Sequence, residues 1–336
     1  MSDRIIDETE LIQNYLAPLA EGAPGAFGLK DDAALIKTEP GIDLVVSTDP
    51  VIAGVHFFAD DAAGDIAWKA LAVNVSDLAA KGAVPIAYTM ALAFPDAPRR
   101  DWMAAFCAGL LEAQTSFGCK LIGGDTDRTP GSLSIGITAF GKIPHGQMLK
   151  RNSAQIGDHV FVTGTIGDAA LGLMLRRSTA PAWREKLGEE HRKYLLARYL
   201  RPLPRLALGP ALRHCASAAL DVSDGLLKDA GRLATGAGAA FEINAQTIPL
   251  SLAATAVIER QPEFLEALVT GGDDYEILCA VNPLKCEVFR QQAAEARVYI
   301  TEIGVLNRGS GVTLVLPNGK QVTPVRTGYD HFRTKD

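Results

Sequence analysis

The chain has 336 residues, of which 48% are hydrophobic and 21% charged, a composition typical of a soluble globular protein long enough for two cores. Its 33 basic and 39 acidic residues give a formal net charge of −6, which does not favour binding to a nucleic acid or to an anionic membrane. An anionic substrate would therefore need local positive charge from a metal ion or from a helix N-terminus.

The start of the chain does not look like a targeting segment. The first sixteen residues carry acidic side chains through any apolar stretch, so they fit an amphipathic helix and not a signal peptide. No run approaches the roughly eighteen apolar residues of a membrane span. Five scattered cysteines without a C-x-x-C pair argue against a disulfide framework or a structural zinc site. We therefore expect a cytoplasmic protein without a membrane partner.

Two kinds of segment alternate in the first half of the chain. Apolar, strand-like runs cover residues 43–48, 86–93 and 133–140, and segments with a helical period cover 66–81 and 99–117. This alternation predicts a mixed α/β architecture for the first half.

A polar stretch with Gly and Pro, residues 141–158, is the expected domain junction. The second half then shows a strand-turn-helix pattern over 219–238 and a strand-like run at 312–316. The sequence therefore predicts an α/β protein of two domains, residues 1–148 and 149–336.

Acidic residues recur near the ends of the apolar runs. Asp is a common turn former and helix cap, so any one of them fits a structural role. Their number, and the glycines beside several of them, favour a shared chemical role. The set comprises Asp31, Asp32, Asp49, Asp77, Asp125, Asp127, Asp221, Asp224, Asp273 and Asp274.

The strand predicted at 43–48 is expected to end in two hydroxyls and a carboxylate, Ser47, Thr48 and Asp49, before a turn that leads to His56. Such oxygen atoms are the ligands that hard cations prefer.

The helix predicted over 66–81 carries a polar strip beside its apolar face. At 100° per residue, Asn74, Asp77 and Lys81 lie along this strip. Asp77 can therefore point out of the packed layer toward a cleft. A solvated side of the helix is the alternative interpretation.

In the strand-turn-helix pattern over 219–238, the strand is expected to end at Val222, with Asp221 at its end and Ser223 or Asp224 as the cap of the following helix. Free N–H groups at a helix N-terminus suit phosphate, and flanking carboxylates suit a hard cation. The segment predicts a corner that binds metal and phosphate.

Two further segments, "GGDTD" at 123–127 and "GGDDYE" at 271–276, join paired glycines to acids. The glycines would let the backbone approach a ligand closely, and the acid could hold Mg²⁺; a plain tight turn is the alternative. Carboxylates, hydroxyls and Gly-rich turns without a nucleophile–base pair indicate several Mg²⁺ ions that neutralise phosphates and align an in-line transfer. From the residues alone, the prediction ends at a Mg²⁺-phosphate enzyme.

The motifs also resemble those of a known family. In chain order they read "KDDAAL", "VVSTDPVIAGVHF", "AWKALAVNVSDLAAKGAVP", "LIGGDTDR", "GDHVFVTGTIGDAALGL", "ALDVSDGLLKDAG", "GGDDYE" and "GYDHF". Together they resemble the thiamine-monophosphate kinase family, of the superfamily of aminoimidazole ribonucleotide synthetase and selenophosphate synthetase. The resemblance implies transfer of the ATP γ-phosphoryl group to thiamine monophosphate, which gives thiamine diphosphate and ADP.

Carried over motif by motif, the resemblance implies three sets of site residues. Magnesium would be associated with Asp32, Ser47, Thr48, Asp49, Asp77, Asp125, Asp221 and Asp224. ATP would contact Gly124, Asp125, Arg151 and Ser223. Thiamine monophosphate would contact His56, Asp273 and Tyr329. No catalytic base is expected, because the attacking phosphate oxygen is already ionised.

The resemblance also implies an N-terminal α/β domain that forms a shared β-barrel with its twin in a homodimer, and a C-terminal α/β domain that completes the site. This sequence departs from the family in two places: the family usually has Gly where Lys30 stands and Glu where Asp273 stands. Lys30 could change the local turn or contact phosphate, and Asp273 reaches one methylene less far toward the substrate.

Two other functions stay open. One is a different ATP-using enzyme of the same superfamily, although the reactive N-terminal Cys expected near a selenium site is absent. The other is a catalytically silent nucleotide-binding module, although mere binding would not need so many magnesium ligands.

Overall fold

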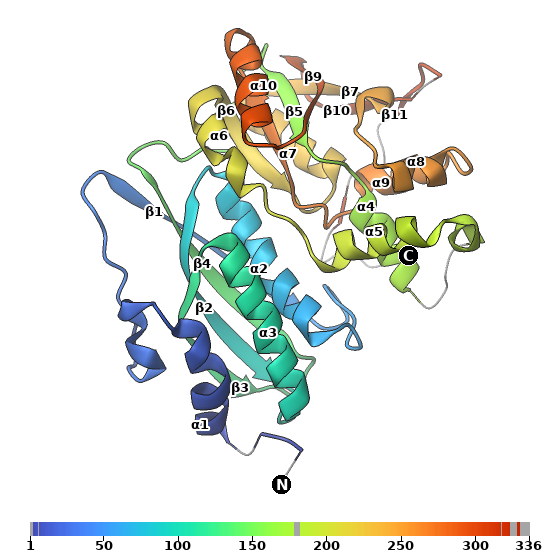
Figure 1. The fold of residues 1–336 in the computed structure, drawn as a ribbon. Coiled ribbons are helices and arrows are strands. Elements are labelled where there is room, and N and C mark those ends of the chain that lie inside the picture. The colour runs from blue at the N-terminus through green and yellow to red at the C-terminus, as the bar shows by residue number, and fades with distance from the viewer. Residues whose placement is uncertain (1–2, 6, 178–181, 317, 323–327, 330–336) are drawn as a thin grey trace. The chain divides into compact units, whose positions relative to one another are not determined.

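The computed structural model describes residues 3–5, 7–177, 182–316, 318–322 and 328–329 (Figure 1). The chain divides into two compact units, and each is mixed α/β, which confirms the predicted fold class. The first unit comprises residues 1–78 and 83–147, and the second comprises residues 79–82 and 148–336.

The first unit is built on a four-stranded sheet of order β1-β4-β2-β3. β4 pairs antiparallel with β1 and β2, and β2 pairs parallel with β3. Figure 1 shows the two long helices lying along the sheet. The elements are β1 (Ile42–Ile52), α2 (Ala63–Ala80), β2 (Val84–Phe94), α3 (Arg100–Phe117), β3 (Lys120–Arg128) and β4 (Ser134–Pro144), preceded by the short α1 (Glu8–Leu11).

Strand β1 is longer than the sequence predicted. It continues through Asp49 and Pro50 to Ile52, so the expected turn directly after Asp49 is wrong. β1 is an edge strand of its sheet, and edge strands tolerate proline because one row of their N–H groups has no partner strand. The hydroxyls and the carboxylate therefore lie within a strand, where successive side chains point to opposite faces.

The "GGDTD" segment also lies within a strand. β3 runs from Lys120 to Arg128, so neither an acid-bearing turn nor a tight turn forms here. A Cβ atom on Gly124 would lie 1.9 Å from the carbonyl oxygen of Met90, and the β2–β3 register shifts between Tyr88 and Thr89. Gly124 is therefore needed for close strand approach, and the segment's glycines do not make a loop.

The second unit is built on a seven-stranded sheet of order β11-β10-β7-β9-β5-β8-β6. Its strands are β5 (His159–Thr163), β6 (Ala216–Val222), β7 (Ala239–Asn244), β8 (Glu276–Val281), β9 (Ile300–Arg308), β10 (Gly311–Val315) and β11 (Gln321–Val322). Its helices are α4 (Asp168–Arg176), α5 (Glu189–Leu200), α6 (Gly209–Cys215), α7 (Leu226–Ala237), α8 (Leu252–Ile258), α9 (Phe264–Thr270) and α10 (Cys286–Glu295).

Every residue of β8 is buried, because helices pack on both faces of the sheet at this strand. Leu278 belongs to a core cluster that includes the apolar stripe of α7, and Cys279 belongs to a second cluster with residues of α6 and α10. A strand that is covered on both faces has a nearly continuous apolar sequence, as β8 has after Glu276.

Both long helices predicted in the first half are confirmed within a few residues of their expected ends. α7 carries a buried apolar stripe and ends at Ala237, with Gly238 in the left-handed conformation as its C-cap; the stripe comprises Leu226, Leu227, Ala230, Leu233 and Ala234.

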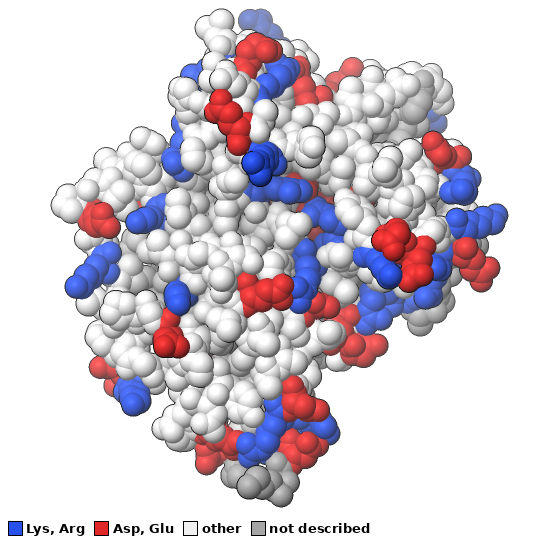
Figure 2. Space-filling view, viewed as in Figure 1, with Lys and Arg blue, Asp and Glu red and all other residues white. Residues whose placement is uncertain are grey.

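Within the residues described, no helix combines the length and the apolar character needed to cross a bilayer. All five cysteines are free thiols. On the face drawn in Figure 2, acidic and basic side chains are interspersed.

Candidate functional site

In the first unit, the polar strip of α2 faces strand β1. The hydroxyl of Ser47 donates a hydrogen bond to the carboxylate of Asp77. The side-chain amide of Asn74 accepts from the N–H of Asp49 at 2.8 Å and donates to its carbonyl oxygen at 3.3 Å. Asn74 is fully buried and Asp77 partly buried, so the alternative of a solvated helix side is wrong for these two residues.

Lys81, the third member of the predicted strip, lies just past the end of α2, and its ammonium group donates to the carbonyl oxygen of Ala219 at 2.8 Å. Both residues belong to the second unit. The side chain therefore ties the residues after α2 to strand β6.

The sheet separates the predicted ligands of the first unit into two groups. Ser47 and Asp49 share the face that Asn74 and Asp77 contact, since side chains alternate along β1. Thr48 points to the other face, where its hydroxyl donates to the Ile137 carbonyl oxygen at 3.1 Å and accepts from Thr138 at 3.0 Å.

Asp125 lies on the same face as Thr48. It is in register with Ala91 of β2, which pairs with Gly136 of β4, which in turn pairs with Pro50 of β1. Residues paired in register point to the same face, and Pro50 is two residues beyond Thr48. The structure thus gathers Ser47, Asp49 and Asp77, and it places Thr48 and Asp125 across the sheet from them.

Asp32 lies in the exposed segment between a 3-10 turn that ends at Leu29 and strand β1. Its neighbour Lys30 has a φ of −113°, a value open to any residue. The replacement of the family's Gly by Lys30 therefore does not strain this turn.

His56 lies in the turn that follows β1. Its Nδ1 atom accepts a hydrogen bond from the N–H of Ile52 at 3.0 Å, so the proton of the neutral ring is on Nε2. The buried ammonium group of Lys69 donates to the His56 carbonyl oxygen at 3.0 Å. The main chain and one ring nitrogen of His56 are thus fixed by the fold.

In the second unit, Asp221 lies within β6 and is 7% exposed, one residue before the strand ends as predicted at Val222. The expected helix cap is wrong, because α7 has Gly225 as its N-cap. The carboxylate of Asp229 instead reaches back from α7 and accepts from the N–H of Asp224 at 3.0 Å.

Basic side chains surround Asp224. Its Oδ2 atom lies 2.5 Å from the guanidinium of Arg232 and 2.8 Å from the ammonium of Lys228. Burial raises the pKa of the neighbouring Asp229 to about 6, with Arg232 opposing the rise and Asp224 adding to it. A cation at Asp224 would have to compete with these two basic side chains.

Three loops of the second unit meet beside the N-terminus of α7. The N–H of Asp273 donates to the Ser223 carbonyl oxygen at 2.9 Å, and the N–H of Tyr329 donates to the Asp224 carbonyl oxygen at 2.9 Å. Four predicted site residues, from three separate motifs, are therefore neighbours. The remainder of the "GYDHF" motif, residues 330–332, lies outside the described residues.

Arg151 is not part of this group of loops. It is exposed, and a Cβ atom on Gly236 would lie 2.9 Å from its carbonyl oxygen. Gly236 is near the far end of α7, about 15 Å along the helix from Leu226. The main chain of Arg151 therefore lies well away from Ser223.

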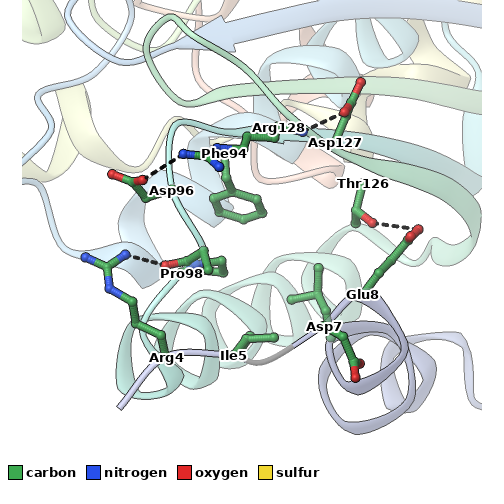
Figure 3. A pocket seen from close by; sticks show the side chains of 12 residues that line it. Arg4, Ile5, Asp7, Glu8, Phe94, Asp96, Pro98, Thr126, Asp127 and Arg128 are labelled. Atoms are coloured by element: carbon green, nitrogen blue, oxygen red, sulfur yellow. Dashed lines mark hydrogen bonds and ion pairs between the residues drawn. The ribbon is translucent and has the colours of Figure 1, made fainter. Parts of the chain in front are cut away.

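The first unit also carries a hollow of about 580 Å³ at the ends of β2 and β3 (Figure 3). Thr126 donates to Glu8 at 3.0 Å across it, and Arg128 lies 3.4 Å from Asp96. Ile5, Leu11 and Phe94 are among the apolar residues that line it. None of the residues expected to contact magnesium, ATP or thiamine monophosphate lines it, although Asp127 of the acid set does.

Among the described residues, no three or more His, Cys, Asp and Glu side chains form a group that could hold a metal ion. The predicted magnesium set mixes carboxylates with the hydroxyls of Ser47 and Thr48, and it comes from both units. The full ligand set therefore stays a prediction.

Comparison with known proteins identifies the chain's relatives. Residues 30–143 match the N-terminal domain of AIR synthase related proteins, and residues 155–317 match the C-terminal domain. The thiamine-monophosphate kinase of Caulobacter vibrioides is 41% identical over 327 residues, which cover 96% of this chain and 90% of the relative.

Solved structures agree with this result. A crystal structure of thiamine-monophosphate kinase from Stenotrophomonas maltophilia K279a superposes with a TM-score of 0.80 at 38% identity, covering 92% of this chain and 96% of that one. A structure of AaThiL complexed with AMPPCP and TMP has a TM-score of 0.75 at 29% identity, covering 92% and 98%.

Both halves of the chain thus have the domains that define AIR synthase related proteins. The chain belongs to this family and, within it, to the thiamine-monophosphate kinases.

Proposed function

We propose that this protein transfers the γ-phosphoryl group of ATP to the phosphate of thiamine monophosphate, which yields thiamine diphosphate and ADP in the last step of thiamine diphosphate synthesis. The observation that carries this proposal is the match to a thiamine-monophosphate kinase at 41% identity over 96% of the chain. The structural relative complexed with AMPPCP, an ATP analogue, and TMP supports both substrates.

Three residues of β1 and α2 fit magnesium. Ser47, Asp49 and Asp77 offer a hydroxyl and two carboxylates on one face of the sheet, and Mg²⁺ prefers such oxygen ligands. We assign these three to magnesium, together with Asp32, Thr48, Asp125, Asp221 and Asp224. Magnesium, when bound, neutralises phosphate charge and so lowers the cost of bringing two phosphates together.

The chain's own groups then bind and orient the reactants. Ser223, whose carbonyl oxygen pairs with Asp273, would contact ATP beside the start of α7, with Gly124, Asp125 and Arg151 as further ATP contacts. His56 would donate from Nε2 to thiamine monophosphate, since its Nδ1 already accepts from Ile52. The acceptor phosphate oxygen is ionised near neutral pH, so no side chain is needed as a base.

Asp273 and Tyr329 would complete the site for thiamine monophosphate. Asp273 is one methylene shorter than the Glu usual in the family, and its main-chain N–H pairs with the carbonyl oxygen of Ser223. Tyr329 is 42% exposed beside the same loops.

We also propose that the first unit pairs with its twin. Leu44, Val46 and Val84 lie on the same face of the four-stranded sheet and are 39%, 55% and 51% exposed. An exposed apolar face of this kind suits burial against a second copy, as in the shared β-barrel that the family implies. Val46→Glu should then shift the mass measured by light scattering from dimer to monomer, whereas an unchanged mass would contradict the pairing.

Three further parts of the proposal rest on sequence alone. The net charge of −6 argues against a nucleic-acid partner, and the chain is proposed to act in the cytoplasm without a membrane partner. The first unit would supply most of the metal ligands and the second would complete the sites for ATP and thiamine monophosphate.

An assay of the purified protein tests the function. It should form thiamine diphosphate and ADP in equal amounts from ATP, Mg²⁺ and thiamine monophosphate, and it should not do so with thiamine or other monophosphates. ATP binding without thiamine diphosphate would favour the silent binding module, and turnover of a different acceptor would favour another enzyme of the superfamily. Either result would remove the kinase assignment.

A further inference from the structure

The loop that joins α9 to β8, residues 271–275, has a strained main chain. Asp273 and Tyr275 have φ values of 72° and 49°, although neither is glycine. The left-handed region is costly for residues with a Cβ atom, so the surrounding structure must hold this conformation.

The loop is wedged between two other segments. A Cβ atom on Gly271 would lie 2.4 Å from the Cβ of Ala170 in α4, and one on Gly272 would lie 2.4 Å from the Ser223 carbonyl oxygen. The N–H of Asp273 pairs with that same oxygen, and the N–H of Tyr275 donates to Val222 at 2.8 Å. The position of Asp273 is therefore set by how tightly the loop is held.

Asp274 anchors the loop to a different element. It is only 1% exposed, and its Oδ2 atom accepts from the N–H of Gly167 at 2.8 Å while Oδ1 accepts from Ala169 at 3.4 Å. Both donors lie at the N-terminus of α4, where the helix dipole favours an acceptor. Asp274 thus ties the loop to α4, and Asp273 beside it pairs with the Ser223 segment.

Arg198 adds a second anchor from α5. Its Nη2 atom donates to the Asp274 carbonyl oxygen at 3.3 Å and to Glu276 at 2.7 Å. Glu276 is fully buried and also accepts from Thr163 at 2.6 Å and from Arg205 at 2.7 Å. The loop is therefore fixed on its β8 side to a buried ion pair.

We propose that Asp274 is a positioning residue for the kinase reaction: it holds the strained loop so that Asp273 stays beside Ser223 and meets thiamine monophosphate. This inference rests on the proposed function. Asp274 itself, buried against α4, does not contact the substrate. The second acid of "GGDDYE" thus holds the first in position.

Kinetics of two variants test this role. Asp274→Ala should raise the KM for thiamine monophosphate about tenfold, a loss of about 1.4 kcal/mol. The KM for ATP and kcat should change less than about twofold, because a contact made equally in the ground and transition states affects KM alone. Asp274→Asn should restore most of the affinity, because its amide oxygen can still accept from Gly167.

Asp158 provides the matched control. It is 2% exposed in the same unit, and its carboxylate accepts from the N–H of Gln155 at 2.9 Å and from the hydroxyl of Ser217 at 2.5 Å. Asp158→Ala should lower the melting temperature much as Asp274→Ala does and leave the KM for thiamine monophosphate unchanged. Equal KM changes in both variants, or none in Asp274→Ala, would overturn the positioning role.

Hydrogen exchange provides a readout that does not depend on turnover. In Asp274→Ala, the amides of Asp273 and Tyr275 should lose protection, whereas in Asp158→Ala they should keep it. Unchanged protection in Asp274→Ala would refute the anchoring even if the wild type made no thiamine diphosphate. Absence of wild-type product with the predicted loss of protection would instead refute the proposed function and leave the anchoring intact.

Discussion

In the first unit Asp77 lies partly buried beside the neutral hydroxyl of Ser47, whereas in the second unit Glu276 is fully buried between Arg198 and Arg205. Asp77 lies near the end of α2, and Glu276 is the first residue of β8. Only Glu276 has its negative charge balanced by basic side chains in direct contact.

This difference separates two uses of a carboxylate. A neutral hydrogen-bond donor orients a carboxylate but leaves its net charge, which then attracts a divalent cation. A buried carboxylate paired with guanidinium groups has no charge left to offer, and its removal strands the partner charges. For Asp77 and Glu276, the charge of the partners therefore indicates which acid can bind a cation and which one anchors the fold.

The largest effect is expected for the acids assigned to magnesium. Asp77→Asn should reduce kcat by about 10³-fold, because it removes a charge that the transition state needs. Asp221→Asn in the second unit should do the same. Steady-state assays at saturating Mg²⁺ measure the loss, and circular dichroism should show that both variants fold.

Ser47→Ala is the control for Asp77. It removes the hydrogen bond that orients Asp77 and a hydroxyl assigned to magnesium, but it keeps the Asp77 carboxylate, so its loss of turnover should be smaller than that of Asp77→Asn. An Asp77→Asn variant with wild-type turnover would mean that this acid is structural, and the comparison with Glu276 would fail.

For the buried acid, Glu276→Gln should lower the free energy of unfolding by about 3–5 kcal/mol, since it leaves two guanidinium groups facing an uncharged amide. Urea denaturation measures this loss. Asp77→Asn should cost far less stability in the same experiment. Equal losses in both variants would erase the distinction between the two acids.

Sequence patterns predicted the helices well because their apolar faces repeat with the helical period. The burial of Leu226, Leu227 and Leu233 in α7 follows directly from that repeat. The ends of strands were harder to predict. Pro50 and Gly124 looked like turn residues, but an edge strand tolerates one and close strand approach requires the other.

The candidate site was predictable only in part. The motifs indicated Ser47, Asp49 and Asp77, and Asn74 was visible as part of the polar strip, but nothing local showed that Asn74 would clamp the main chain of Asp49. The buried Arg198–Glu276 pair joins residues 78 positions apart. No local pattern indicates such a contact, so the anchoring of the substrate loop could not be found from the sequence.

His56 combines the roles of Asp77 and Glu276, because the fold holds its ring and its Nε2 proton would be donated to the substrate. His56→Ala should raise the KM for thiamine monophosphate about tenfold, the loss expected for one hydrogen bond to a charged group. The KM for ATP should change less. Initial rates with each substrate varied in turn decide this, and the reverse order would contradict the placement of His56.

The smallest effect is expected at a partly exposed surface acid. Asp43 accepts from the N–H of Gly146 at 2.9 Å and lies 2.8 Å from the ring of His145. The pKa of Asp43 is lowered, first by the Gly146 N–H and then by His145, and the pKa of His145 is raised by Asp43. Asp43→Asn should therefore lower the pKa of His145 in an NMR titration.

The pH dependence of this pair has a defined sign. The raised pKa of His145 contributes stability below its unfolded value, about 6.5, and this contribution is lost as the pH rises through the folded value. The lowered pKa of Asp43 contributes stability above about 3.9 and loses it as the pH falls through the folded value. The free energies of unfolding of wild type and Asp43→Asn, measured by urea denaturation, should thus differ most near pH 5. This difference should become smaller by pH 8.5, where only the Gly146 contact remains. A difference that grows from pH 5 to pH 8.5 would show that the ion pair with His145 does not form in solution.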